Sequence, residues 1–206
     1  MKTHTGTILA IMTVLEVVAP RIAHADAASC KDLASLSLSA LKDAPSQITG
    51  TRFVKASGSI PAYCDVIGYT AAQVGWRARL PEDWNGRFHM EGCGTLCGVL
   101  RVENLDDPLS RGTAVATTDM GRSAPLAPAE WSKDGEPGYN VITRSGEWAF
   151  NNLEQELDYF YRGTHKATLA SKAIVAAYYG TDIDFAYWRG CSTGGRQGLL
   201  MAQRYP

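Results

Sequence analysis

The segment IDFAYWRGCSTGGRQGLL, residues 183–200, combines three patterns in a row. Its apolar and aromatic beginning predicts a short strand over Ile183–Trp188. Gly190–Gly194 follow and match the pattern G-x-S-x-G, and the residues after them have a helical pattern. A G-x-S-x-G turn between a strand and a helix is typical of a nucleophile elbow. The segment therefore predicts that Ser192 is a nucleophile, raised on a tight turn at the end of a strand.

The spacing of the two glycines has a steric reason. A side chain at Gly190 or Gly194 would collide with neighbouring backbone on either side of the turn. The helix that starts after Ser192 favours negative charge at its N-terminus, so the Thr193 N–H is a candidate oxyanion donor. The alternative is a chance match, because glycine is in mild excess at 20 of 206 residues, against a usual share of about 7%.

The sequence on the N-terminal side of the elbow predicts an α/β fold. Residues 148–179 form the strongest helical pattern, which we expect to break near Gly163 and to stop at Gly180. The order strand, helix, strand, turn, helix predicts a mainly parallel sheet with helices on its faces. Other predicted elements are a short helix within 30–42, strands within 47–80, 87–90 and 113–118, and a loop over 121–147.

A second glycine cluster, Gly92–Gly98, follows the strand predicted at 87–90. A loop in this place of an α/β-hydrolase carries the second oxyanion donor, and bare backbone lets an N–H approach a substrate oxygen closely. We expect Gly94 to be that donor. The alternative is a glycine turn held by a Cys93–Cys97 bridge, and both interpretations can hold together.

The overall composition excludes several classes of protein. Apolar residues make up 45% of the chain, charged residues 20%, and the net charge is −1. These values are typical of a globular protein of one domain and argue against disorder or a coiled coil. The near-neutral balance also argues against a nucleic-acid partner, since such binding depends on clustered Lys and Arg.

The first 25 residues predict a secretory signal peptide. Lys2 precedes an apolar run over 8–19, and Ala23–Ala25 form an A-x-A cleavage site. The run is too short for a membrane anchor, which must cross about 30 Å of hydrocarbon. We expect cleavage near Ala25, a secreted or periplasmic mature chain over residues 26–206, and no association with a membrane.

All five cysteines lie after this site, and an oxidising compartment favours disulfides. An odd number leaves one cysteine without a partner within the chain. Zinc binding by the Cys93-x3-Cys97 pair is the alternative, but no second pair at a suitable spacing completes a set of ligands. The sequence therefore predicts no metal site.

A nucleophilic serine needs a base, and no histidine follows Ser192 in this sequence. In α/β-hydrolases the triad order is serine, then acid, then histidine. We therefore expect packing or hydrogen-bonding roles for His89 and His165, the two histidines of the mature chain. We expect Asp119, which follows the strand within 113–118, to be a turn or structural acid.

The segment YWRGCSTGGRQGLLMAQRYP, residues 187–206, resembles the tannase and feruloyl esterase family of α/β-hydrolases. GCSTGGRQG within it is highly specific. Residues 170–180, 91–94 and 112–121 are similar to the helix, oxyanion loop and following strand of the family. The resemblance extends from about Cys30 to the end of the chain.

The resemblance implies a secreted serine esterase that cleaves small-molecule esters of aromatic acids, such as gallic or ferulic acid, through an acyl-enzyme on Ser192. It implies a bridge from Cys191 to a cysteine beside the catalytic histidine. The remaining cysteines would then pair as Cys30–Cys64 and Cys93–Cys97. The family also carries a lid after the elbow, usually with structural calcium, whereas no cofactor is expected in the residues present here.

The sequence ends at Pro206, soon after the elbow. The lid, its calcium site, the triad Asp and His and the partner of Cys191 would lie beyond this point. We therefore expect the N-terminal part of an α/β-hydrolase domain, inactive by itself. Two alternatives remain: a non-catalytic secreted module that retains the elbow as a relic, and another acyl hydrolase or acyltransferase.

Overall fold

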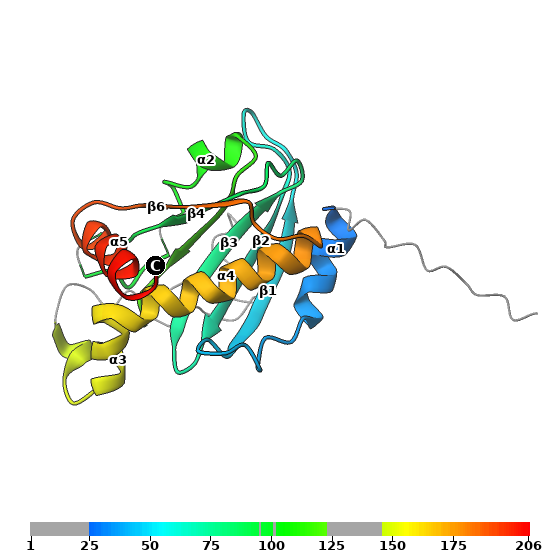
Figure 1. Ribbon diagram of the computed structural model, residues 1–206. Helices are drawn as coiled ribbons and strands as arrows, with labels where there is room; N and C mark the ends of the chain where they lie inside the picture. The colour runs from blue at the N-terminus through cyan, green and yellow to red at the C-terminus, as the bar shows by residue number, and fades with distance from the viewer. Residues whose placement is uncertain (1–24, 95, 101, 123–145) are drawn as a thin grey trace, which may run out of the picture.

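The computed structural model describes residues 25–94, 96–100, 102–122 and 146–206, which form a six-stranded sheet flanked by helices (Figure 1). The signal peptide expected at 1–25 and the loop expected at 121–147 lie almost entirely outside the described residues. The strands, all of them in expected places, are β1 (Ser46–Val54), β2 (Tyr63–Thr70), β3 (Val74–Pro81), β4 (Arg87–Glu91), β5 (Ala114–Thr118) and β6 (Phe185–Arg189).

The sheet has the order β1-β2-β3-β5-β4-β6 and is mixed. The pairs β1–β2, β2–β3 and β3–β5 are antiparallel, whereas β5–β4 and β4–β6 are parallel. The α/β class is confirmed, but only the neighbouring strands β5, β4 and β6 are parallel to one another, whereas a mainly parallel sheet was expected. The connections between β1, β2 and β3 are short, and short connections join antiparallel strands.

The helices confirm the expected order and correct one boundary. Residues 30–42 are helical only at their start, because α1 (Ala27–Asp32) and a 3₁₀ turn η1 (Leu33–Ser35) end at Ser35. Leu38 instead bridges to Ser46 at the start of β1, an interaction that helical spacing does not predict. The other helical elements are α2 (Asp106–Ser110), η3 (Gly146–Ala149), α3 (Leu153–Leu157), the π-helical turn η4 (Asp158–Arg162), α4 (Gly163–Tyr179) and α5 (Thr193–Arg204).

The break expected near Gly163 is the π-helical turn η4, after which α4 begins at Gly163 itself. The helix ends where expected, because Gly180 adopts a left-handed conformation with φ of 67° and its N–H donates to Ala176 O.

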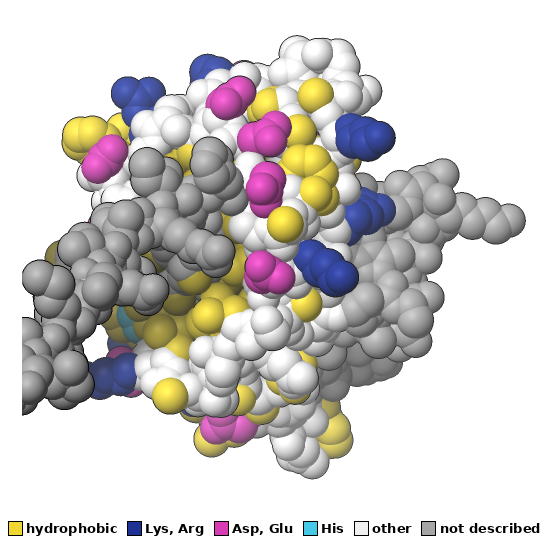
Figure 2. All heavy atoms as spheres, turned by 90° about the vertical axis from the view of Figure 1, so that its right-hand side faces the viewer, with side chains coloured by type: hydrophobic (Ala, Val, Ile, Leu, Met, Phe, Trp, Pro, Cys, Tyr) yellow, Lys and Arg dark blue, Asp and Glu magenta, His cyan; other side chains and the backbone are white. Residues whose placement is uncertain are grey.

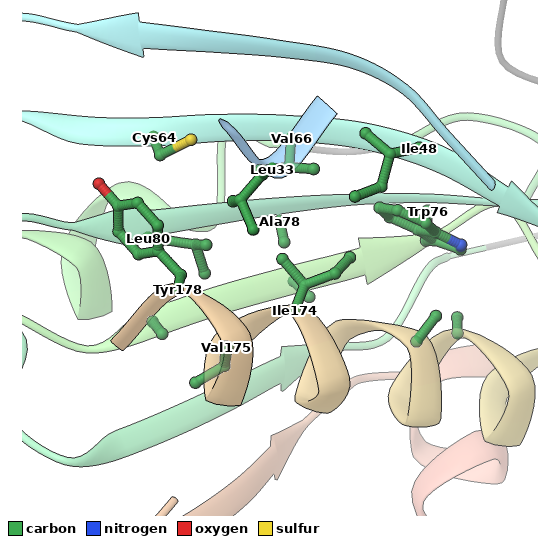
Figure 3. Packing of buried hydrophobic residues seen from close by; sticks show 14 of the residues in the cluster. Leu33, Ile48, Cys64, Val66, Trp76, Ala78, Leu80, Ile174, Val175 and Tyr178 are labelled. Carbon is green, nitrogen blue, oxygen red and sulfur yellow. The ribbon is translucent and has the colours of Figure 1, made fainter. Parts of the chain in front are cut away.

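The main core lies between the sheet and the layer formed by α4 and α1 (Figures 1 and 3). On β3, Trp76 and Ala78 point into this core, while Arg77 between them points to the opposite face. Figure 3 shows Ile174 of α4 opposite Ala78, with Leu33 closing the layer. Burial of a leucine or isoleucine side chain such as Leu33 or Ile174 contributes roughly 1.5–3 kcal/mol. This core supports the strands whose ends form the site described below.

The opposite face of the sheet is covered by a smaller cluster around α2, with Leu105 and Leu109 fully buried. Seen from the side of α1, acidic and basic side chains lie interspersed on the surface among uncharged atoms (Figure 2). No helix within the described residues is both long enough and apolar enough to cross a membrane.

Candidate active site

Two strand ends meet at one edge of the sheet. β4 and β6 run parallel, and Glu91 pairs with Arg189 at their carboxyl ends. The Gly92 N–H extends this pairing by donating to Arg189 O at 2.8 Å. Because parallel strands present their carboxyl ends at the same edge, the glycine loop after β4 and the turn after β6 lie together.

The turn after β6 has the geometry of a nucleophile elbow. Ser192 is exposed and has φ of 56° and ψ of −119°, a backbone conformation that residues other than glycine rarely adopt. It is the N-cap of α5, and its carbonyl accepts the N–H of Arg196 at 3.1 Å. The backbone therefore places this one side chain at the junction of strand and helix, above the N-terminus of α5.

Glycine is required at the elbow because backbone atoms occupy the space of a side chain. A Cβ at Gly190 would lie 2.4 Å from the carbonyl carbon and oxygen of Gly194. A Cβ at Gly92, in the neighbouring loop, would lie 2.6 Å from the Gly194 Cα. A Cβ at Gly94, in contrast, would meet no atom of the described residues within 4 Å. The two loops are thus in backbone contact at Gly92 and Gly194, whereas the described residues leave room for a side chain at Gly94.

Trp188 of β6 contacts the first turn of α5 and holds it in place. Its indole N–H donates to Gly194 O at 3.0 Å. A Cβ at Gly198 would lie 2.5 Å from the Trp188 Cδ1, so this glycine makes room for the ring. The helix that begins after Ser192 is therefore held to the strand that precedes it.

Two backbone N–H groups at the start of the glycine loop are engaged in hydrogen bonds within the fold. The Gly92 N–H is used by Arg189 O, and the Cys93 N–H donates to the Gln197 Oε1 at 3.2 Å. Neither group is therefore placed to bind a substrate oxygen. The N–H groups of Gly94 and Thr193 stay the predicted oxyanion donors.

Two disulfides are present, Cys30–Cys64 and Cys93–Cys97, and they are the pairs that the resemblance implies. Cys191, beside Ser192, is an exposed free thiol. The first disulfide joins α1 to β2 in the main core, and the second closes the glycine loop on itself.

Two side chains that sequence reasoning missed hold the glycine loop. Gln197 of α5 contacts both sulfur atoms of the Cys93–Cys97 bridge. Arg122 is buried, and its guanidinium donates to Leu96 O at 2.8 Å. Burial lowers the pKa of the Arg122 guanidinium from its ordinary value. The available signal was position, because Gln197 follows the elbow and Arg122 follows a strand. Their hydrogen-bond partners, however, are distant in sequence.

The described histidines are engaged away from Ser192. His89 Nε2 lies 3.0 Å from the Glu91 Oε2, and Arg189 Nε donates to the same oxygen at 2.9 Å. His165 stacks on Tyr205 with ring centroids 3.6 Å apart. Within the described part of the chain, neither histidine is placed as a base for this serine.

Asp119 is a turn acid at the end of β5. It is fully buried, and its Oδ1 accepts the N–H groups of Gly75 at 2.9 Å and Gly121 at 2.8 Å. Its carboxylate thus joins β3 to the turn that leaves β5.

The described residues contain no group of three or more His, Cys, Asp or Glu side chains that could hold a metal ion. The calcium site that the resemblance implies would belong to the lid, which lies outside the described residues.

Comparison with known proteins identifies the family. The family model for tannase and feruloyl esterase matches residues 55–206. The chain is 31% identical over 168 residues to mono(2-hydroxyethyl) terephthalate hydrolase of Piscinibacter sakaiensis, covering 73% of this chain and 26% of that protein. It is 31% identical over 129 residues to feruloyl esterase B of Aspergillus niger, covering 63% of this chain and 21% of that protein.

Solved structures agree on the fold. An esterase from Aspergillus oryzae superposes with a TM-score of 0.66 at 20% identity, over 87% of this chain and 35% of that one. Feruloyl esterase B from Aspergillus oryzae gives a TM-score of 0.63 at 22% identity, again over 87% and 35%. The chain thus spans from about a fifth to about a third of the length of these relatives. Through the match over residues 55–206, the chain belongs to the tannase and feruloyl esterase family.

Proposed function

We propose that this chain supplies the nucleophile of a serine carboxylic ester hydrolase that cleaves esters of aromatic acids, such as ferulic or gallic acid. The observation that carries the proposal is the backbone of Ser192, which has positive φ at the junction of β6 and α5. Strained backbone at a non-glycine residue persists where the surrounding structure enforces it, and such residues cluster at active sites.

The proposed reaction runs through an acyl-enzyme. The Ser192 Oγ attacks the ester carbonyl while its proton passes to a base, and the carbonyl oxygen gains negative charge. The N–H groups of Thr193 and Gly94, with the dipole of α5, would stabilise that oxyanion. The carbon–oxygen bond to the alcohol then breaks, the alcohol takes the proton, and water later releases the acid from Ser192.

The base belongs to residues outside those described. His89 is hydrogen-bonded to Glu91 and His165 is stacked on Tyr205, so neither is offered to Ser192. We propose that the exposed thiol of Cys191 pairs with a cysteine beside that base, as the resemblance implies. Such a bridge would tie the nucleophile to the base across the site.

An aromatic acyl group and export are part of the same proposal. Relatives carry the names feruloyl esterase and mono(2-hydroxyethyl) terephthalate hydrolase, which both refer to aromatic acids. The two disulfides and the signal-peptide pattern at residues 1–25 favour an oxidising compartment. Residues 26–206 would then be the secreted part of this sequence.

Hydrolysis of methyl ferulate and methyl gallate tests the proposal. Two proteins are compared: the 206-residue chain, and the longest polypeptide that its reading frame encodes. We expect turnover by the polypeptide that includes the base, a loss of about 10⁴-fold or more in kcat for Ser192→Ala, and negligible turnover by the 206-residue chain. Ser171→Ala is the matched control, since Ser171 is buried in α4 and its hydroxyl has no hydrogen-bond partner among the described residues.

Turnover that survives Ser192→Ala would refute the nucleophile. Ser192-dependent turnover by the 206-residue chain would refute the placement of the base. Acyl transfer to an added alcohol in preference to water would indicate an acyltransferase, and folded protein without any turnover would favour a non-catalytic module.

A further inference from the structure

Gln197 is a buried polar side chain close to the proposed nucleophile. It lies on α5, five residues after Ser192, and only 1% of its surface is exposed. A glutamine is rarely so completely buried unless its amide is satisfied by hydrogen bonds. The hydrogen-bond partners of Gln197 therefore indicate the role of this position of α5.

Within the described residues, each hydrogen bond of the Gln197 amide goes to the glycine loop. Its Oε1 accepts the Cys93 N–H at 3.2 Å. Its Nε2 lies 2.9 Å from the Cys93 sulfur and 3.4 Å from the Cys97 sulfur. One side chain of the nucleophile helix thus holds both the backbone and the disulfide of the loop after β4.

This contact is made at a tightly packed point. A Cβ at Gly92 would lie 2.9 Å from the Gln197 Oε1 and 2.6 Å from the Gly194 Cα. The loop and α5 therefore touch through the glutamine amide on one side and through bare backbone on the other. A shift of the loop relative to α5 would have to break the hydrogen bond at Cys93.

We propose that Gln197 is a positioning residue, which sets the distance between Ser192 and the backbone N–H groups that follow Cys93. This inference rests on the proposed function, in which the Gly94 N–H binds the oxyanion. Gln197 acts through Cys93 and does not touch the substrate. Catalysis is sensitive to such placement, because an error of about 1 Å can cost about 100-fold in rate.

A purely structural role for Gln197 makes a different prediction. If the side chain only fills space, an apolar residue of similar length would serve equally well. Gln197→Met retains the length and removes all the hydrogen bonds, whereas Gln197→Glu retains an oxygen that accepts the Cys93 N–H. The two substitutions separate packing from hydrogen bonding.

The experiment measures geometry and catalysis in the same variants of the hydrolytically active protein. Geometry is followed by hydrogen exchange and mass spectrometry of peptides that cover residues 90–100. Catalysis is followed by kcat and KM with methyl ferulate. For Gln197→Met we expect faster exchange at Cys93, a kcat lower by about 10–100-fold and a KM changed by less than about threefold. The reason is that a displaced loop N–H would bind the oxyanion less well, and the oxyanion forms only in the transition state. Gln197→Glu should recover part of kcat.

A double-mutant cycle links the effect to the disulfide. Cys93→Ala/Cys97→Ala removes the sulfur partners of Gln197, so adding Gln197→Met should lower kcat by less than the product of the separate effects. Tyr179→Phe is the control for stability. It removes a partly buried hydrogen bond from the Tyr179 hydroxyl to Pro81 O, at the opposite edge of the sheet, and should leave kcat unchanged.

The outcomes separate the inference from the proposed function. Active wild-type protein with an unchanged kcat in Gln197→Met, or with equal losses in the Met and Glu variants and additive effects in the cycle, would overturn the inference alone. Wild-type protein without hydrolysis would remove the proposed function and, with it, the catalytic role of Gln197.

Discussion

Two regions of the sheet are constructed on opposite principles. β3, in the antiparallel part, is buried along all of its residues, Val74–Pro81. β6, which leads to Ser192, is exposed along most of Phe185–Arg189. β3 and its neighbours rely on large side chains and paired charges, whereas the elbow after β6 relies on glycines and backbone contacts.

The difference separates stability from geometry. In the antiparallel region, removing a side chain leaves a cavity or an unpaired charge, so its substitutions should lower the free energy of unfolding. At the elbow, adding a side chain forces backbone apart, so its substitutions should first disturb the placement of Ser192. The two regions should therefore fail differently when they are altered.

The largest effect on stability is expected at Asp65, which is fully buried between strands. Its Oδ1 accepts the Nε of the fully buried Arg77 at 2.7 Å. Asp65→Ala removes this carboxylate from a buried guanidinium, and we expect a loss of about 3–5 kcal/mol in urea unfolding. Asp107→Asn, which breaks the exposed pair with Arg111, should leave the unfolding midpoint unchanged. Equal midpoints for both variants would contradict the account of the buried pair.

The two disulfides offer the second comparison. Cys30–Cys64 closes a separation of 34 residues and Cys93–Cys97 a separation of 4. From chain entropy, removing the first should cost about 4 kcal/mol and removing the second about 2 kcal/mol. Thermal unfolding of the two double-alanine variants measures the difference. A larger loss for the shorter bridge would show that the glycine loop supports the fold as well as the site.

Gly190 and Gly94 compare a filled position with an open one in the same site. Gly190→Ala places a Cβ against the backbone of Gly194, and we expect a loss of about 1–3 kcal/mol with a drop of about 100-fold in kcat. The added Cβ of Gly94→Ala would meet no atom of the described residues within 4 Å, so we expect stability to change by less than about 0.5 kcal/mol. Activity and urea unfolding are measured in parallel. Tolerance of alanine at position 190 would contradict the steric account of the elbow.

The smallest effect concerns pH. Burial lowers the pKa of His165 below its ordinary value, and the nearby charge of Asp43 opposes this only partly. The unfolded chain therefore binds the proton more readily, so stability should fall as the pH decreases through about 6.5, the pKa of a free histidine. His165→Gln should make the unfolding midpoint less dependent on pH between 7.5 and 5.5. An unchanged slope would show that His165 is not responsible.

The elements could be predicted where local pattern decides the structure. β-branched and aromatic runs gave the positions of the strands, and Gly180 gave the end of α4, because both signals lie within a few residues. The helix expected over 30–42 was too long, since Leu38 pairs with Ser46 instead of continuing the helix. Such a pairing depends on the folded sheet, which no local period encodes.

The site was predictable in part for the same reason. The G-x-S-x-G pattern placed Ser192 at a strand-to-helix turn, and the structure has that turn. Gln197 and Arg122 were missed because their partners are the sulfurs and carbonyls of a loop that comes beside them only in the fold. Polar residues that support a site through distant backbone leave no motif.

The central claim is that Ser192 carries the acyl group, and trapping tests it most directly. The hydrolytically active protein is quenched in acid during turnover of methyl ferulate, digested and analysed by mass spectrometry. The account predicts a feruloyl adduct on the peptide that contains Ser192, absent in Ser192→Ala and present in Ser171→Ala. An adduct on another residue, or turnover of Ser192→Ala at the wild-type rate, would contradict it.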